Sequence, residues 1–412
     1  MHTRTPIPER PDGQIELAER LCVELALDAQ SHGAEIRTHS RVELPVLAEG
    51  KVTGVTYRDL MTDQIHTVHA PVIYNVAGPW IDRVFTQSTQ LPAQPRLNGG
   101  TKGSHLIVDT FPGAPKEVIY YETRTDGRLI LVIPWLGKYM LGTTDIRWEN
   151  DPGDARCDIG ELEYLLREVN ALIPSADLAI DDVLYTYSGV RPLPYEPEKN
   201  ESAVTRTHIL FDHKSNGADG LVTIVGGKLT TFRQLAEDAV ADLNKRLKRG
   251  KLKSLTRNRK LPGAHFKDLD SLVSELINLG ASDRIANRLA RIYGSRSLEI
   301  WSIIELDESA SELIDSSIGL TKAEIEYVLV EEFPKTLTDL MARRLILAFE
   351  KGHGLDAIEK IAKIAAGKLG WNSDEVARQI EGYKAWLNHL AIPDETGPRS
   401  THFGAKQMSE SR

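Results

Sequence analysis

The chain has 412 residues, 41% hydrophobic and 26% charged, which is long enough for two or three globular domains. Its net charge of −9 argues against a general nucleic-acid binder. No apolar run approaches the ~18 residues of a membrane span, and the polar start of the chain shows no secretion signal. The two cysteines, Cys22 and Cys157, have no metal-site spacing, which favours reduced thiols in a cytoplasmic protein.

The first third of the chain predicts a helix followed by strands. Residues 1–12 are polar and proline-rich and are expected to be a disordered lead-in. A helix is expected from Gln14 to about Ser31, because apolar residues recur every four positions and Gly33 suits its C-cap. Alternating or apolar runs predict strands at residues 35–38, a hairpin of 52–57 and 65–68, and a strand at 71–76.

The middle of the chain predicts an antiparallel sheet, a common wall for a substrate site. Its strands are expected at residues 105–108, 118–121, 129–134 and 139–142. An amphipathic helix is expected over 158–173. A short buried strand, Val222–Val225, and a long helix with one apolar stripe, residues 232–247, complete this half.

Residues 261–392 change to 3.6-residue periods without strand patterns, which predicts a separate helical domain. The basic stretch Lys245–Lys260 is interpreted as a linker, and the tail after Ile392 as disordered. The expected division is therefore residues 1–12, a domain of 13–254, a helical domain of 255–392 and a tail of 393–412.

Residues 222–233 are the most informative stretch for function. After the buried strand, Gly226 and Gly227 allow a sharp turn and a close backbone approach to a ligand. Lys228 adds a cation, and Thr230 or Thr231 can cap the following helix, whose N-terminus attracts anions. Together these features predict a cradle for a cofactor or an anion.

Two further motifs carry candidate chemistry. Arg191 lies between Gly189 and Pro192, which stiffen the backbone, so its guanidinium is pre-aimed for a carboxylate or phosphate; an ordinary turn is the alternative. His105 opens a strand and can act as a general base, although an ordinary half-buried polar residue is the alternative. The segment Gly142–Asp145 is interpreted as turn chemistry.

Three other patterns are rejected. His66 and His69 are three apart on a strand, so they face opposite sides and predict no metal site. Residues 352–354 match part of a dinucleotide loop, but a helix precedes them, so a helix–helix turn is expected. No serine has the context of a hydrolase nucleophile.

In order, these motifs resemble the FAD-dependent glycerol-3-phosphate dehydrogenases and their relatives, the α-glycerophosphate oxidases. The resemblance runs from about Asp12 to about Leu387. The stretches that carry it are residues 75–80, 102–105, 133–135, 142–145, 187–193, 226–233, 261–263 and 291–294. The resemblance implies an α/β (α+β) fold: a Rossmann-like FAD domain with an antiparallel substrate-binding sheet, plus an all-α C-terminal domain.

The resemblance also implies an activity in glycerol metabolism. The family moves a hydride from carbon 2 of sn-glycerol 3-phosphate to flavin N5, giving dihydroxyacetone phosphate. Electrons then pass to a membrane quinone, or to oxygen in the oxidases, which is one alternative for this chain. A cytoplasmic location, peripheral on the inner face of the cytoplasmic membrane, and a homodimer are further expectations, with no metal and no nucleic acid.

Site residues follow from the same resemblance. His105 is expected to take the hydroxyl proton and Arg191 to lie near the reacting hydroxyl. The expected substrate-binding residues are Arg128, Arg206 and Lys228, with Arg206 and Lys228 on the phosphate. The expected FAD-binding residues are Val42, Ala77, Gly78, Trp80, Gly226, Gly227, Leu229 and Thr230.

The sequence departs from the family at its start. The family's first strand, Gly-X-Gly-X-X-Gly turn and helix, which bind the FAD pyrophosphate, have no match here. The FAD domain is therefore expected to be incomplete and to retain FAD weakly. A catalytically inactive truncated remnant is the second alternative.

Overall fold

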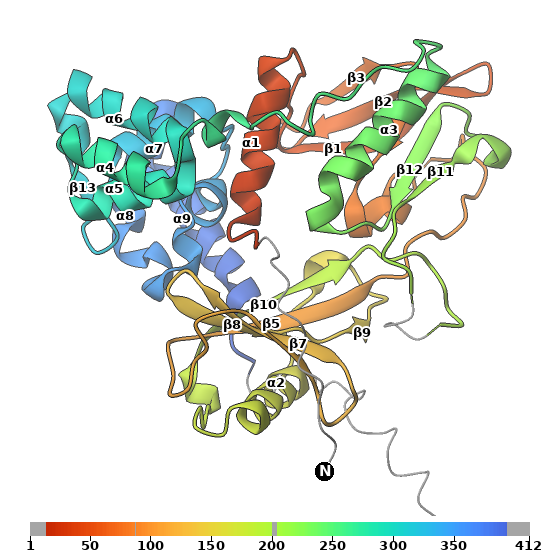
Figure 1. Cartoon of the computed structure of the whole chain (residues 1–412). Coiled ribbons are helices and arrows are strands. Elements are labelled where there is room, and N and C mark those ends of the chain that lie inside the picture. Colours follow the sequence, from red (N-terminus) through yellow and green to blue (C-terminus); the bar gives the residue numbers. More distant parts are fainter. Residues whose placement is uncertain (1–13, 87, 200–203, 394–412) are drawn as a thin grey trace, which may run out of the picture.

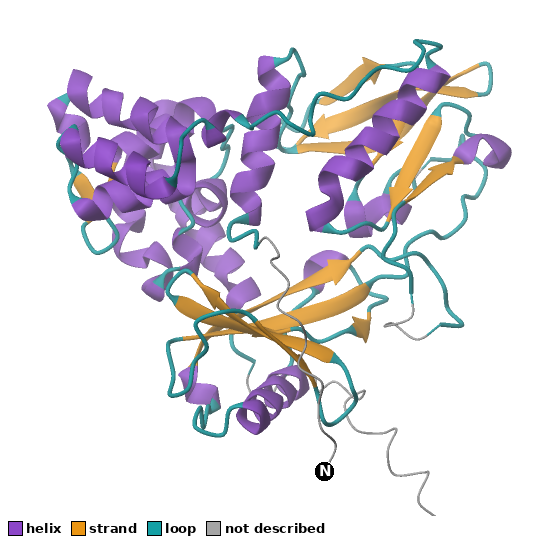
Figure 2. Cartoon of the chain, viewed as in Figure 1, coloured by secondary structure: helices purple, strands orange, loops and turns teal. Residues whose placement is uncertain are grey.

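The computed structural model describes residues 14–86, 88–199 and 204–393 (Figure 1). The stretches predicted to be disordered, 1–12 and 393–412, lie outside these residues except for Pro393. The described chain forms a helical body, an upper region of two small sheets and a lower sheet with one covering helix, as Figure 2 shows by secondary structure.

Helix α1 (Ala18–Ser31) leads into an antiparallel sheet of order β1-β2-β3, and this confirms the predicted helix and hairpin. The strands are β1 (Ser40–Ala48), β2 (Lys51–Asp59) and β3 (Ile65–His69). The strand predicted at residues 35–38 is wrong. That segment is tied to the helical body instead, since Thr38 Oγ1 donates to Phe333 O at 3.2 Å and His39 Nε2 lies 2.7 Å from Asp339 Oδ2.

The second small sheet has the order β11-β12-β4. Strands β4 (Ile73–Asn75) and β12 (Leu221–Val225) are parallel, and β11 (Ile209–Asp212) is antiparallel to β12. Because β4 and β12 run the same way, the turns that follow them meet at one edge of the sheet. All five residues of β12 are buried, which confirms the predicted buried strand.

Helix α3 (Phe232–Arg246) follows β12, as predicted. Its apolar stripe is only partly covered. Asn244 is the one buried residue within α3, and Val240 is 53% exposed. The helical period therefore predicted the element correctly but not the burial of its stripe.

The lower sheet is antiparallel throughout and confirms the four strands predicted for the substrate wall. Its order is β10-β5-β8-β7-β6, with β9 paired to β5. The strands are β5 (Thr101–Val108), β6 (Ile119–Glu122), β7 (Leu129–Trp135), β8 (Lys138–Gly142), β9 (Ile146–Arg147) and β10 (Val183–Arg191).

Helix α2 (Ile159–Leu172) covers one face of this sheet. Its apolar side packs on the strands in a buried cluster that includes Leu106, Leu141 and Leu165. Asp158 and Glu161 form a capping box that fixes where the helix starts. The carboxylates of both cap residues also lie within ion-pair distance of Lys102 on β5, so the helix start is tied to this strand.

The C-terminal region is helical, as predicted. It contains α4 (Leu269–Asn278), α5 (Asp283–Tyr293), α6 (Ser297–Leu306), α7 (Lys322–Glu331), α8 (Ile358–Leu369) and α9 (Ser373–Trp386). A small hairpin of β13 (Leu313–Asp315) and β14 (Leu320–Thr321), which the periodicity missed, lies among them. Residues 352–354 all have positive φ, so they form a turn between helices and not a dinucleotide loop.

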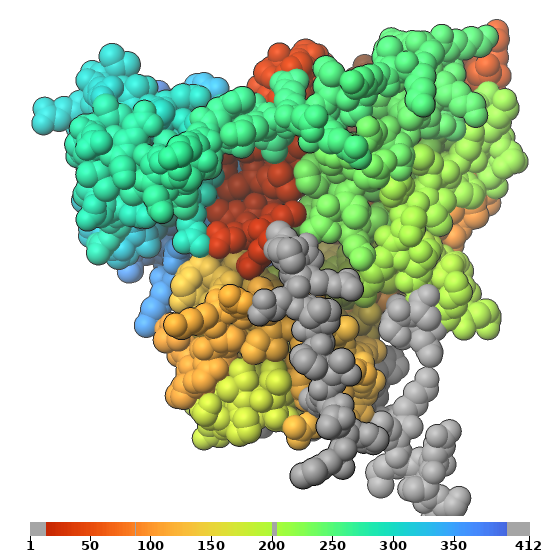
Figure 3. Space-filling view, in the orientation of Figure 1, coloured from red at the N-terminus to blue at the C-terminus, as the bar shows by residue number. Residues whose placement is uncertain are grey.

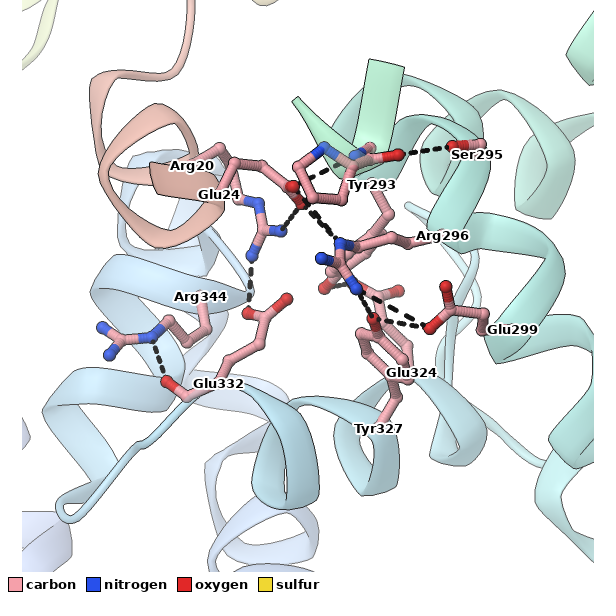
Figure 4. Close-up of polar contacts among 12 residues, drawn as sticks. Arg20, Glu24, Tyr293, Ser295, Arg296, Glu299, Glu324, Tyr327, Glu332 and Arg344 are labelled. Atoms are coloured by element: carbon pink, nitrogen blue, oxygen red, sulfur yellow. Dashed lines mark hydrogen bonds and ion pairs between the residues drawn. The ribbon is translucent and has the colours of Figure 1, made fainter. Parts of the chain in front are cut away.

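A buried ion cluster joins α1 to the helical body (Figure 4). Arg20 donates to Glu332 at 2.5 Å, and its guanidinium lies over the Tyr293 ring at 4.7 Å. Arg296 donates to Glu24 at 3.0 Å. Burial raises the pKa of Glu332 while Arg20 lowers it. These contacts fix α1 between the helical body and the sheets.

Within the described residues, none of the helices combines the length and apolar character that crossing a bilayer requires.

Candidate functional site

A pocket of about 420 Å³ lies where β5 and β10 meet the loop after β12. It brings together three of the motifs singled out in the sequence: the start of β5, the end of β10 and the glycine turn at 226–229. Its lining residues are Gly103, His105, Tyr187, Gly189, Val190, Arg191, Pro192, Leu193, Arg206, Gly227, Lys228 and Leu229.

His105 stands on the wall of this pocket. Its ring stacks on Tyr187 with centroids 4.8 Å apart, and a Cβ on the neighbouring Gly142 would lie 2.5 Å from the imidazole. Its Nδ1 is buried and has no hydrogen-bond partner among the described residues. Burial, with a smaller effect of the Arg191 charge, lowers the pKa of His105 to about 3. The imidazole is therefore neutral near pH 7 and has a lone pair that can accept a proton.

Arg191 is held in one orientation by the turn after β8. Its Nη1 donates to Asp145 Oδ1 at 3.0 Å, and its Nη2 donates to Thr143 Oγ1 at 2.9 Å and to Thr144 O at 3.2 Å. A Cβ on Gly103 would lie only 2.2 Å from Nη2, so the absence of a side chain there makes room for the guanidinium. Burial lowers the pKa of Arg191 and the Asp145 carboxylate raises it, and the group remains a cation.

Two of the other predicted cations, Arg206 and Arg128, contact Asp145 as well. Arg206 Nη2 lies 4.0 Å from Asp145 Oδ2, and Arg128 Nη1 donates to the Asp145 carbonyl at 2.5 Å. Lys228 lines the pocket and forms no ion pair with the part of the chain that the structure describes. The pocket is thus lined by three cations, Arg191, Arg206 and Lys228, of which two share the Asp145 carboxylate, and the excess of positive charge suits a phosphate. Arg128 is not one of the lining residues, and it pairs with Asp126 at 3.4 Å.

The sequence did not predict a set of buried polar residues, Lys102, Thr144, Asp158 and Glu161, that supports the turn holding Arg191. The buried Lys102 ammonium lies 2.7 Å from Glu161 and 3.2 Å from Asp158, at the start of α2. Burial disfavours the charged amine, but the two carboxylates outweigh this and raise the pKa of Lys102. Thr144 Oγ1 donates to Glu161 Oε1 at 2.6 Å, so this set reaches the turn that holds Arg191.

The motifs around these residues were visible in the sequence, but not the contacts between them. The local pattern of residues 142–145 indicates only a turn, yet the Asp145 carboxylate pairs with both Arg191 and Arg206. The capping pattern of Asp158 and Glu161 is a local signal for a helix start. Nothing local indicates that Glu161 also reaches across to β5 and the β8 turn.

The turns at the edge of the β4–β12 pair have glycine backbones in the left-handed region. Gly226 and Gly227 have φ values of +75° and +94°, and Gly78 has a φ of +56°. A Cβ on Gly78 would meet nothing within 4 Å, so its backbone is open to a ligand. Trp80 and Leu229 leave 42% and 47% of their surface exposed, which offers apolar contact beside these backbones.

The remaining predicted cofactor residues are less closely gathered. Ala77 lies in the turn after β4, where its N–H donates to Asn75 Oδ1 at 3.2 Å. Val42 lies within β1, in a different sheet, and is not among the pocket residues. Thr230 is exposed in the short 3-10 helix η6 (Leu229–Thr231).

The predicted threonine cap of α3 is wrong. Thr231 occupies the position before the helix, but its side chain makes no capping bond there. Its hydroxyl donates instead to Lys228 O at 3.0 Å, which stabilises the turn that presents Lys228. Across the described residues, no group of His, Cys, Asp and Glu could hold a metal ion.

Comparison with known proteins gives matches along most of the chain. Residues 9–233 match the family model described as FAD dependent oxidoreductase, and residues 254–376 match the C-terminal domain of alpha-glycerophosphate oxidase. A glycerol-3-phosphate dehydrogenase from Synechocystis sp. is 35% identical and is matched over 93% of this chain and 71% of its own length. The aerobic glycerol-3-phosphate dehydrogenase of Bacillus subtilis is 30% identical, over 91% and 68%.

A solved structure supports the fold. The glycerol-3-phosphate dehydrogenase from Bacillus halodurans complexed with FAD superposes with a TM-score of 0.78 and 28% identity. The match covers 93% of this chain and 74% of that chain. The predicted mixed fold with a helical C-terminal region is confirmed.

Proposed function

This chain belongs to the FAD-dependent glycerol-3-phosphate dehydrogenase family, and from that premise we propose that it oxidises sn-glycerol 3-phosphate to dihydroxyacetone phosphate. The observation that carries the proposal is the pocket, which Arg191, Arg206 and Lys228 line together with His105. Cations bind the phosphate, and a base removes the proton of a secondary alcohol as it becomes a ketone.

We assign the phosphate to Arg206 and Lys228, because both line the pocket. Among the described residues, Arg206 approaches a carboxylate only at 4.0 Å, that of Asp145, and Lys228 forms no ion pair. Arg191 is anchored by Asp145 and orients the reacting hydroxyl. We assign acceptance of the hydroxyl proton to His105, because this residue lines the pocket and its Nδ1 has no hydrogen-bond partner among the described residues. Arg128 acts by holding the Asp145 backbone.

FAD, when bound, supplies the two-electron acceptor for the hydrogen of carbon 2. The glycine turn at Gly226–Gly227 and the exposed Leu229 and Thr230 would hold one edge of the ring. Ala77, Gly78 and Trp80 would contact it from the end of β4, and Val42 would approach the adenine side. The N-terminal end of α3 would favour negative charge on the reduced ring.

We propose a quinone as the electron acceptor, with the protein peripheral on the inner face of the cytoplasmic membrane as a homodimer. The rival is an oxidase that uses oxygen, and the match of residues 254–376 to the alpha-glycerophosphate oxidase C-terminal domain favours keeping it. We also retain, as a proposal, the division into an FAD and substrate domain of 13–254 and a helical domain of 255–392.

Anaerobic reduction of the flavin tests the oxidation directly. Protein mixed with excess FAD is expected to bleach the flavin absorbance with glycerol 3-phosphate and not with glycerol, which lacks the phosphate. Bleaching by both compounds at equal rates, or by neither, would refute the assignment. Adding a soluble quinone or oxygen to the reduced protein then separates the acceptors, because only the oxidase produces stoichiometric hydrogen peroxide.

A further inference from the structure

One surface feature is not explained by the oxidation. Residues 245–260, the basic segment, contain nine lysines and arginines and no acidic residue, in a chain whose net charge is −9. The segment begins in the last turn of α3 and continues as an extended strap toward the helical body (Figure 1). Figure 3 shows the green strap crossing the surface in front of the recessed red helix α1.

Most cations of this segment are free. Arg246 pairs with Asp242 and Asp212, and Arg259 pairs with Asp28 on α1. Those pairs hold the two ends of the strap. In the described part of the chain, no ion pair is formed by the exposed residues Lys245, Lys248, Arg249, Lys251, Lys253 and Arg257.

Two leucines are exposed among these cations. Leu252 is 64% and Leu255 is 72% exposed, which are among the most exposed large apolar side chains described. Leu252 lies between Lys251 and Lys253, so apolar and cationic groups alternate along the strap. Moving exposed leucine side chains out of water is favourable, and a bilayer interface can bury the leucines while its lipid head groups contact the neighbouring cations.

We propose that the basic segment is a docking surface for an anionic lipid bilayer, with Leu252 and Leu255 inserted at the interface. Lysines and arginines near an anionic surface are attracted by its potential within a Debye length. A nucleic acid fits less well, because the segment has no aromatic side chain on which bases could stack and nucleic acid offers the leucines no apolar partner. The inference rests on the peripheral location proposed above and names the surface that provides it.

Sedimentation with vesicles tests the proposal without FAD or substrate. The full chain is expected to bind vesicles of phosphatidylcholine with phosphatidylglycerol, to bind phosphatidylcholine alone poorly, and to dissociate at high salt. The double variant Lys251→Glu/Lys253→Glu should bind at least about 25-fold more weakly, at about fivefold for each cation lost. Leu252→Ser/Leu255→Ser should also weaken binding while leaving the charge unchanged.

The matched control is Lys363→Glu/Lys368→Glu on α8, which makes the same charge change at exposed lysines outside the segment. It should retain most of the binding. Equal loss in both charge variants, equal binding to neutral vesicles, or tighter binding to RNA than to anionic vesicles would overturn the proposal. Absence of flavin reduction would leave these results unaffected, so the two proposals fail independently.

Discussion

Gly103 controls where Arg191 can stand, so Gly103→Ala perturbs the site without removing any polar group. The new Cβ would lie 2.2 Å from Nη2 and 2.5 Å from Nη1 of Arg191, whereas ordinary contact begins at 3.4 Å. The guanidinium must therefore move by about 1.2 Å, the difference between 3.4 and 2.2 Å. A misplacement of about 1 Å in a positioning group can lower rates by about a hundredfold.

The expected result is a fall of about a hundredfold in kcat/KM for glycerol 3-phosphate in steady-state assays with excess FAD. The hydrogen bonds of Arg191 to Asp145 and Thr143 would also weaken, which costs about 1–3 kcal/mol of stability. Gly382→Ala is the matched control, because Gly382 lies exposed in α9 and its Cβ would meet nothing within 4 Å. A Gly103→Ala protein with the activity of this control would refute the assignment of Arg191.

Three other expectations follow from buried groups. Burial lowers the pKa of His105 to about 3, so the folded protein favours the neutral imidazole, and the stability this residue contributes is fully present above its unfolded pKa of about 6.5 and is lost as the pH falls. In urea unfolding, the difference in unfolding free energy between wild type and His105→Asn should shrink by at most about 3 kcal/mol from pH 7 to pH 4. Arg20→Met should lower the free energy of unfolding by about 3–5 kcal/mol, measured by thermal unfolding, because the buried Glu332 carboxylate loses its partner. The double variant Arg20→Met/Glu332→Met should recover most of this stability, and equal losses in both variants would contradict a buried ion pair. Glu161→Gln should lower kcat more than it raises KM, because it loosens the turn that holds Arg191, and an unchanged kcat would exclude that route.

Local sequence patterns predicted the elements well where burial agrees with the pattern. Val222–Val225 is a short run rich in β-branched residues and is fully buried, and the strands of the lower sheet fall within a few residues of their predicted positions. The strand expected at 35–38 failed because Thr38 and His39 bind the helical body, which lies some 300 residues later in the chain. A local pattern carries no information about such a partner.

Some site residues could likewise be predicted from local sequence, and others depend on contacts with distant parts of the chain. Arg191, His105 and Lys228 stood out because glycine, proline or a strand start restricts each one locally, and all three line the pocket. The role of Asp145 could not be inferred, since its importance depends on arginines from three separate segments. Helix α3 shows a second limit of local sequence patterns. Its periodicity identifies the helix but does not indicate how much of its apolar stripe the rest of the chain buries.

The central claim is that this pocket holds a phosphorylated polyol with its phosphate on Arg206 and Lys228. A crystal structure with FAD and glycerol 3-phosphate measures this directly. The account predicts phosphate density within hydrogen-bond distance of both cations, with the carbon 2 hydroxyl facing His105 and Arg191. Phosphate density on Arg191, or a ligand bound away from this pocket, would contradict it.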